Sequence, residues 1–236
     1  MKLESDYCSG TAVLLFAQSE NKESISKPIT CQDRQNIVFW REMNERAWKT
    51  IKKTNLPFFI SDEACQKGKT FGDKLAGAIS KVFAKGYDKV IVIGNDCPNL
   101  KCSHLLEAVI KLKTADVVLG ADFKGGVYLI GVSKVAFNAK VFSAFSWQTC
   151  TVFKELRLYF NNYSCSLLPR LNDFNRSSDL KDVLKNLSFS DSIRSLLLSL
   201  TQENTIGKNN ATFLVSSDLS VFNYNKGSPL IFNNFI

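Results

Sequence analysis

Short apolar runs and amphipathic segments alternate along most of this chain. The apolar runs are rich in β-branched residues, a composition typical of strands that are buried on both faces of a helix-covered sheet. They predict strands at 11–17, 56–60, 89–94, 116–120, 127–132 and 165–169. Between them, apolar residues recur at helical spacing and predict helices at 33–53, 71–83, 103–112, 152–160, 178–184 and 193–200. The pattern indicates an α/β fold.

Two of the predicted strands, 116–120 and 127–132, lie too close together in the sequence for a helix to connect them. A parallel connection needs a crossover of a dozen or more residues. We therefore expect one antiparallel or offset strand in a sheet that is otherwise parallel, so that the sheet is mixed.

The composition changes after Gln202. Residues 203–236 are rich in Asn, Ser and Phe, with short apolar pieces between polar turns. They are too aromatic for a plainly disordered tail. We predict one α/β domain over residues 1–202 and a β-like extension over residues 203–236, which covers a sheet edge or joins a partner, including a second copy of the chain.

Composition narrows the class of protein. The 236 residues are 45% hydrophobic, which is enough for a large core without disulfides. The polar start has no signal-peptide core, and no apolar run is long enough to span a bilayer. Seven cysteines without a CxxC pair favour a reducing cytoplasm. With one histidine, His104, the remaining nucleophile–base option is Cys97 with His104, and nothing in the sequence orients that pair.

The net charge of +8 is the next constraint. Its lysines are spread through the predicted helices rather than clustered with aromatic residues, which favours solvated helix faces. A small phosphorylated ligand is the second interpretation and nucleic acid the third. We therefore expect a phosphorylated small molecule, not nucleic acid, as the partner.

Polar side chains follow two of the predicted strands. Asn95 and Asp96 come directly after the strand at 89–94, and Asp173 and Asn175 follow the strand at 165–169. Ligands of open α/β sheets bind outside the carboxyl ends of the strands, and magnesium prefers oxygen ligands. These side chains are thus candidates for a metal–diphosphate site. The alternative is that they only initiate turns, which Asn and Asp also do well.

Three further features are weaker candidates for ligand-binding residues. Gly125 and Gly126 precede a strand and could let a ligand approach the backbone, although tight turns use the same dipeptide. Lys124 beside them could neutralise a phosphate. Trp147 lies in a polar loop, where it either stacks on a sugar or base or closes the edge of the core.

Seven blocks of sequence, in order and spacing, resemble one known family. They are Gln-Lys-Gly at 66–68, Phe-Gly-Asp-Lys-Leu at 71–75, Val-Ile-Gly-Asn-Asp-Cys-Pro at 92–98, Asp-Val-Val-Leu-Gly at 116–120, Gly-Gly-Val-Tyr-Leu-Ile-Gly at 125–131, Trp-Gln-Thr at 147–149 and Leu-Asn-Asp at 171–173. The family is the bacterial nucleotide-diphospho-sugar-transferase-like proteins, often labelled radical-SAM/selenodomain-associated or arsenosugar-biosynthesis glycosyltransferases. The resemblance covers roughly residues 11–185.

The resemblance implies a three-layer α/β/α sandwich of GT-A type, Rossmann-like, with a mixed, mostly parallel sheet. It also implies a glycosyltransferase-like protein that binds a nucleotide-diphosphate sugar through a divalent cation, magnesium or manganese, at the strand-end Asp96. The site residues carried over are Asp96 and Asp173 as catalytic, Asp96 and Asn175 as metal ligands, and Asn95, Lys124, Gly125, Gly126 and Trp147 as substrate-binding.

The chain departs from the family pattern at three places. The loop at 18–26 lacks the basic Lys-Thr-Arg-Leu segment, for which Lys22 and Lys27 are loose substitutes. Lys124 replaces the Asp of an Asp-Gly-Gly motif, and 173–175 reads Asp-Phe-Asn in place of Asp-Val-Asp.

These departures leave two alternatives open. One is a nucleotidyltransferase on the same fold, although the loop at 18–26 has none of the glycines that would hold a triphosphate. The other is a non-catalytic binding protein in which Lys124 takes the place of the cation. The sequence specifies neither the sugar, the base nor the acceptor.

Overall fold

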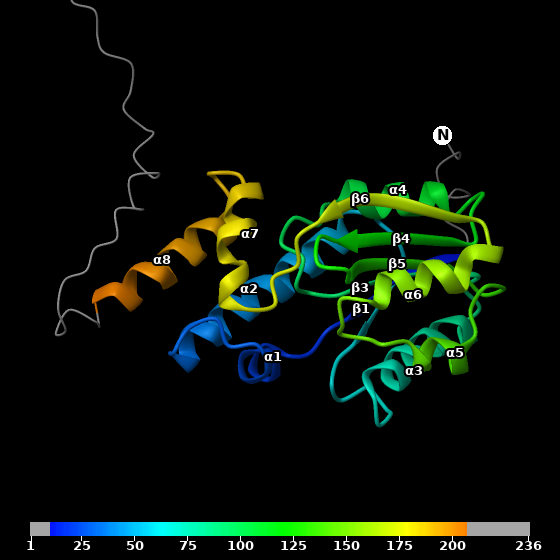
Figure 1. Cartoon of the computed structure of the whole chain (residues 1–236), viewed down its shortest axis with the longest axis horizontal. Coiled ribbons are helices and arrows are strands. Elements are labelled where there is room, and N and C mark those ends of the chain that lie inside the picture. The colour runs from blue at the N-terminus through cyan, green and yellow to red at the C-terminus, as the bar shows by residue number, and fades with distance from the viewer. Residues whose placement is uncertain (1–9, 207–236) are drawn as a thin grey trace, which may run out of the picture.

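The computed structural model describes residues 10–206, so most of the predicted extension at 203–236 lies outside the described residues. Six strands form one sheet (Figure 1). They are β1 (Thr11–Phe16), β2 (Phe58–Ser61), β3 (Lys89–Ile93), β4 (Val117–Asp122), β5 (Val127–Ser133) and β6 (Cys165–Leu171). The helices are α1 (Glu20–Ser26), α2 (Asp33–Lys52), α3 (Phe71–Ala84), α4 (Cys102–Lys111), α5 (Ala139–Ala144), α6 (Val152–Tyr159), α7 (Leu180–Asn186) and α8 (Ser192–Ile206).

The sheet has the strand order β2-β1-β3-β5-β4-β6, and β5 alone runs antiparallel to its neighbours. The mixed sheet expected from the short connection between β4 and β5 is thereby confirmed. Because β5 lies between β3 and β4, the carboxyl ends of these two parallel strands stay at the same edge of the sheet, one strand apart.

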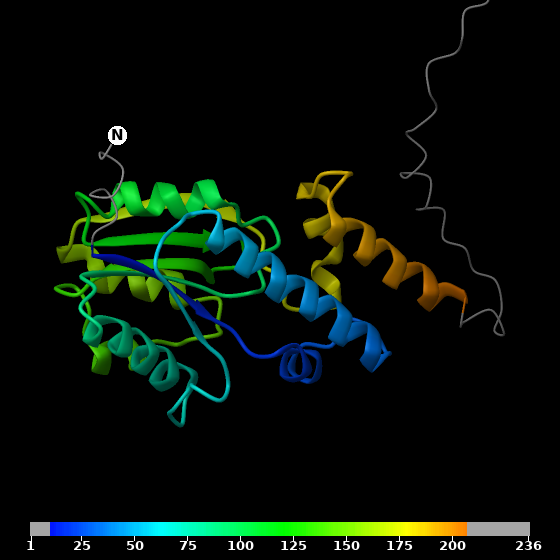
Figure 2. The same ribbon diagram turned by 180° about the vertical axis from the view of Figure 1, so that it is seen from behind.

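Helices cover both faces of the sheet (Figures 1 and 2). Alternate strand residues enter two separate cores: Leu14 packs with residues of α3, α5 and α6, while Val13 packs with the carboxyl-terminal half of α2 and with α4. This double burial explains why the strands read as continuous apolar runs. The three-layer α/β/α sandwich is confirmed.

A third apolar cluster lies beyond the carboxyl ends of the parallel strands (Figure 1). It joins the amino-terminal half of α2 to α7 and α8, and Phe39 meets Phe174 with ring centroids 5.0 Å apart. Phe174 is fully buried there. Its anchorage holds the flanking Asp173 and Asn175 at the edge of the sheet where β3 ends.

The segment expected to be a polar loop after β1 is instead a short helix, α1, and that expectation was wrong. Ser19 caps the helix, because its side chain accepts a hydrogen bond from the backbone N–H of Lys22. Glu20 and Glu23 lie in the first turn, where negative charge favours a helix. The polar sequence hid this helix because α1 packs along α2 rather than against the sheet.

Other boundaries differ in detail. The helix α5 has no counterpart among the predicted helices. The helix predicted at 103–112 is α4, which begins one residue earlier, at Cys102. The helix predicted at 178–184 is α7, which begins at Leu180. Gly86 lies just past the end of α3 with a φ of +96°, a conformation that commonly ends a helix and that glycine adopts without strain.

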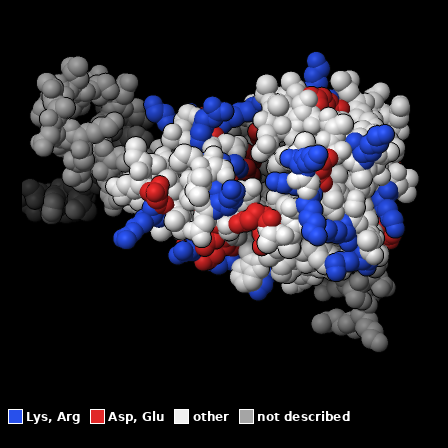
Figure 3. Space-filling model, turned by 90° about the horizontal axis from the view of Figure 1, so that it is seen from below, with Lys and Arg blue, Asp and Glu red and all other residues white. Residues whose placement is uncertain are grey.

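Charged side chains are distributed rather than gathered on the face drawn in Figure 3, where Lys and Arg lie over much of the surface with Asp and Glu between them. Within residues 10–206, none of the helices has the length and apolar character that crossing a membrane requires.

Candidate functional site

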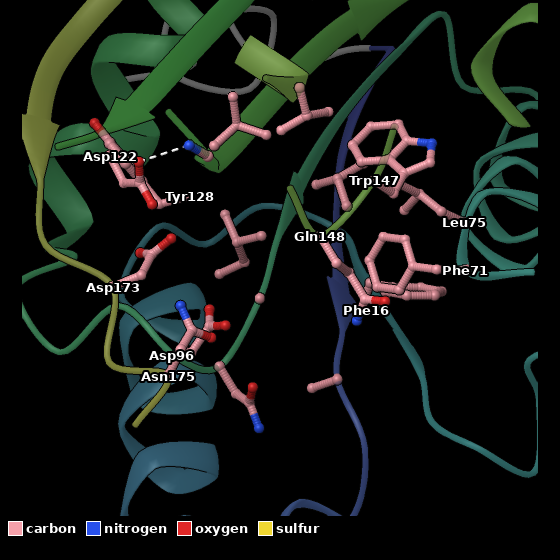
Figure 4. A pocket seen from close by; sticks show the side chains of 18 of the residues that line it. Phe16, Phe71, Leu75, Asp96, Asp122, Tyr128, Trp147, Gln148, Asp173 and Asn175 are labelled. Atoms are coloured by element: carbon pink, nitrogen blue, oxygen red, sulfur yellow. Dashed lines mark hydrogen bonds between the residues drawn. The ribbon is translucent and has the colours of Figure 1, made fainter. Parts of the chain in front are cut away.

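A cavity of about 620 Å³ opens at the carboxyl edge of the sheet. Figure 4 shows its two unlike sides: Asp96, Asp122 and Asp173 on one, and Phe16, Phe71 and Trp147 on the other. We call these the acidic side and the aromatic side. The cavity brings together most of the residues singled out in the sequence, namely Asn95, Asp96, Lys124, Gly126, Trp147, Asp173 and Asn175.

Asp96 is fixed by the turn that ends β3. Its carbonyl accepts a hydrogen bond of 2.7 Å from the N–H of Phe174, which ties the two strand-end segments together. Gly94 leaves room for the carboxylate, because a Cβ at that position would lie 2.8 Å from Oδ1 of Asp96. The neighbouring Asn95 is buried, and its side-chain amide donates a hydrogen bond of 2.8 Å to Oδ1 of Asn44. This bond anchors the turn to α2.

The ammonium of Lys27 lies beside Asp96. Its Nζ is 3.0 Å from Oδ2 of Asp96 and 3.7 Å from Oε2 of Glu23, and it lies 5.3 Å from the centre of the Trp40 ring. Burial by itself would lower the pKa of Lys27, but the carboxylates of Asp96 and Glu23 raise it above the usual value. Lys27 therefore carries a full positive charge. Sequence reasoning gave Lys27 only a loose role and overlooked Glu23.

Asp173 is a buried carboxyl group of the acidic side. It is 7% exposed, and its Oδ1 has no hydrogen-bond partner within the described part of the chain. Burial raises the pKa of Asp173 well above its usual range, and the charges of Asp96 and Asp122 raise it further, against a hydrogen bond from the Cys97 thiol. A buried oxygen without a partner is costly, so this atom is suited to a ligand.

Asp122 is a lining residue that the sequence reasoning missed. Its Oδ1 accepts hydrogen bonds from the backbone N–H groups of Lys124, at 2.7 Å, and Gly126, at 2.6 Å. It thereby closes the turn between β4 and β5. An aspartate three residues before a Gly-Gly dipeptide is a turn signal that could have identified it.

The two glycines have defined packing roles in that turn. Gly125 has a φ of +91°, and a Cβ there would lie 1.9 Å from the carbonyl oxygen of Cys150. At Gly126 a Cβ would lie 2.7 Å from Oδ2 of Asp122. Gly126 lines the cavity, whereas Gly125 faces the loop at 147–151 and holds it close. A direct role of either glycine in substrate binding stays a prediction.

Lys124 reaches across the cavity rim to Asp179, with which its ammonium forms an ion pair. Burial would raise the pKa of Asp179, but the bond from Lys124 and the N–H groups of Asn175 and Arg176 lower it below its usual value. The ammonium of Lys124 is therefore directed to Asp179, and the ammonium beside Asp96 is that of Lys27.

The aromatic side is a row of rings in contact. The ring centres of Phe16 and Phe71 are 5.4 Å apart, and those of Phe71 and Trp147 are 5.8 Å apart. The indole N–H of Trp147 donates to the carbonyl of Phe142 at 2.7 Å. A Cβ at Gly72 would lie 2.8 Å from Cδ1 of Trp147. Trp147 thus closes the edge of the core and also forms part of the cavity wall.

The resemblance implies a divalent metal at the acidic side, and the donor chemistry fits one. Within residues 10–206, no three His, Cys, Asp or Glu side chains form a ready-made ligand set. Magnesium usually takes one or two carboxylates and completes its shell with water and phosphate oxygens. Asp96, Asp173 and the amide oxygen of Asn175 suit that role, and the unpaired Oδ1 of Asp173 is the atom such a cation would satisfy.

The pair of Cys97 and His104 does not form a nucleophilic centre. Burial, followed by the charge of Asp173, raises the pKa of Cys97 well above its usual value, so the thiol stays neutral. His104 uses its Nδ1 to accept from the N–H of Lys101 at the start of α4.

Two solved structures are similar to this chain. A protein from Desulfovibrio desulfuricans G20, provisionally assigned as a nucleotide-diphospho-sugar transferase, matches with a TM-score of 0.69 and 22% identity over 83% of this chain and 98% of that chain. A glycosyltransferase involved in glycosylating the major capsid of PBCV-1 matches with a TM-score of 0.46, 11% identity, and coverage of 81% and 99%. The first of these shows a GT-A-like fold. Among curated proteins, no match was found.

The family resemblance stated from the sequence blocks is also confirmed. Residues 31–149, about half of the chain, match a family described as "Uncharacterized protein conserved in bacteria (DUF2064)". The matched range includes Asn95, Asp96, the Gly125-Gly126 turn and Trp147, whereas β1, α1 and Asp173 lie outside it. This chain therefore belongs to the DUF2064 family.

Proposed function

We propose that this protein binds a nucleotide-diphosphate sugar in the cavity and acts as a glycosyltransferase. The observation that carries this proposal is the buried, unpartnered Oδ1 of Asp173 beside the strand-end Asp96, in a cavity whose opposite wall is aromatic. The assignment of the D. desulfuricans protein as a nucleotide-diphospho-sugar transferase supports the same class.

The acidic side is the place for the diphosphate. Asp96, Asp173 and Asn175 would hold a magnesium or manganese ion, which, when bound, neutralises charge on a leaving diphosphate. Lys27 keeps the carboxylate of Asp96 in place through its 3.0 Å contact and adds a positive charge to the same wall. The aromatic side would pack against the uncharged part of the ligand and exclude water from it.

A nucleotidyltransferase is less well supported. Such an enzyme must hold a triphosphate, and glycine-rich loops do so with successive backbone N–H groups. In this chain the segment after β1 is the helix α1, which Ser19 caps. The N–H and hydroxyl of Ser19 both donate to Glu63, so a carboxylate of the protein already occupies this helix start.

The test is binding of sugar nucleotides by calorimetry, with and without manganese. We expect UDP- or GDP-sugars to bind the wild-type protein only with the metal, and Asp96→Asn and Asp173→Asn each to abolish that binding. Asp182→Asn is the matched control, since Asp182 is exposed on α7 and lies outside the cavity. Unchanged binding by the Asp96 variant would contradict the proposal. Release of pyrophosphate from a nucleoside triphosphate would favour the nucleotidyltransferase instead.

A further inference from the structure

We propose that Gln148 determines specificity for the sugar, by hydrogen bonding to ring hydroxyls while the ring packs on the aromatic side. This inference rests on the proposed function. Gln148 lies on the aromatic side of the cavity, with Phe16, Phe71 and Trp147, and opposite Asp122 and Asp173 (Figure 4).

The backbone of Gln148 has an unusual conformation. Its φ is +63°, and within residues 10–206 Asn55 is the one other non-glycine residue with a positive φ. Asn adopts this conformation readily in turns, whereas Gln has no such preference. A conformation of this kind persists where the surroundings enforce it, and such positions cluster at functional sites.

The loop around Gln148 is held on both sides. The Thr149 hydroxyl donates to the carbonyl of Ser146 at 2.6 Å. Glu155 accepts from the N–H of Ser146 and from the hydroxyl of Thr151, both at 2.8 Å. The indole N–H of Trp147 also donates a hydrogen bond to the carbonyl of Phe142, so the loop is anchored before and after Gln148. The backbone that carries Gln148 is therefore held at the cavity by the fold in advance of any ligand.

The side-chain amide of Gln148 is free to bind a ligand. It is exposed at the cavity, and it makes no hydrogen bond to another residue of the described chain. The indole N–H of Trp147 is already used, so Gln148 supplies the hydrogen-bonding group next to the Trp147 ring.

A sugar matches this combination. One face of its ring presents C–H groups to an aromatic surface, while its edge carries hydroxyls that both donate and accept. An amide also offers both, through its NH₂ group and its carbonyl oxygen. Pockets of this type use apolar contact for affinity and a few fixed polar groups for orientation. A fixed polar group of this kind discriminates strongly between ligands that carry the matching hydroxyl and ligands that lack it.

The variant that tests this inference is Gln148→Gly. Glycine adopts a positive φ without strain, so the substitution removes the amide and leaves the loop intact. Asn55→Gly is the matched control, because it makes the same backbone change at an exposed turn outside the cavity. Both variants should melt at or above the wild-type temperature.

The measurement compares UDP with UDP-glucose, and GDP with GDP-mannose, by calorimetry in the presence of manganese. We expect Gln148→Gly to weaken binding of the sugar nucleotide by about tenfold, the effect of losing one hydrogen bond, and to change binding of the free diphosphate by less than about twofold. Gln148→Asn should lie between, and Asn55→Gly should match the wild type.

The outcomes separate this inference from the proposed function. Equal weakening for the sugar nucleotide and the free diphosphate would assign the amide to the base or the phosphates and overturn the inference. Unchanged binding of the sugar nucleotide would overturn it as well, while leaving the proposed function intact. If the wild-type protein bound neither ligand of either pair, the proposed function and this inference would fail together.

Discussion

Lys27 and Asp96 lie 69 positions apart in the sequence, yet the Nζ of Lys27 is 3.0 Å from Oδ2 of Asp96. Lys27 follows directly on α1, and Asp96 follows β3. The contact gives the acidic side its own positive charge, and this charge balances part of the repulsion among Glu23, Asp96 and Asp173.

Lys27→Met should lower stability and raise the affinity for metal. The carboxylates of Asp96 and Glu23 would lose their counterion in a partly buried position, which we expect to reduce the free energy of unfolding by about 2 kcal/mol. Urea denaturation measures this loss, and adding manganese should restore more stability to the variant than it adds to the wild type. Lys27→Arg keeps the charge and serves as the control. A variant that is as stable as the wild type, with the same response to manganese, would show that this ion pair has no such role.

Gly125→Ala should destabilise the protein through a steric clash as well as through backbone strain. The new Cβ would lie 1.9 Å from the Cys150 carbonyl, at a positive φ. Gly86→Ala is the matched control, since its φ is also positive but no atom lies within 4 Å of the Cβ that alanine would add. We expect a loss of about 1 kcal/mol for Gly86→Ala and about 3 kcal/mol or more for Gly125→Ala. Equal losses in chemical denaturation would mean that the hairpin and the loop at 147–151 separate easily.

Gly77→Ala should stabilise the protein. Gly77 lies within α3, and a Cβ there would meet its nearest neighbour, the carbonyl oxygen of Lys67, at an ordinary 3.8 Å. Alanine restricts the unfolded chain and favours the helix, so the free energy of unfolding should rise by about 0.5–1 kcal/mol. Thermal unfolding checks this, and a lower melting temperature would indicate that the loop at 66–69 packs more tightly on α3 than the structure shows.

The loop that carries Gln148 should loosen in acid. Hydrogen bonds from the N–H of Ser146 and the hydroxyl of Thr151 lower the pKa of Glu155 below its usual 4.5. A lowered pKa stabilises the folded state above the unfolded pKa, and that contribution is lost as the pH falls from about 4.5 through the folded value. The melting temperature of the wild type should therefore fall more between pH 6 and pH 3 than that of Glu155→Gln. Parallel pH profiles would contradict this role of Glu155.

Local sequence patterns were sufficient to predict the layers of the fold. Apolar runs such as Thr11–Phe16 indicated strands covered on both faces, because burial of both faces requires apolar residues at every position. The short connection before Val127 required an antiparallel strand for geometric reasons alone. Asp96 could be placed at the ligand edge because it follows the carboxyl end of a strand, and ligands of α/β sheets bind outside those ends.

The composition of the site depended on packing between distant segments. Phe174 is held by Phe39 of α2, and the charge of Lys27 reaches Asp96 only because α1 is a helix that packs along α2. Gln148 was given no role of its own from the sequence, because the cavity wall on which it lies forms only when separate elements pack together. The sequence around a residue indicates its secondary structure and its burial. The residue that it faces across a cavity is decided only when separate elements pack together.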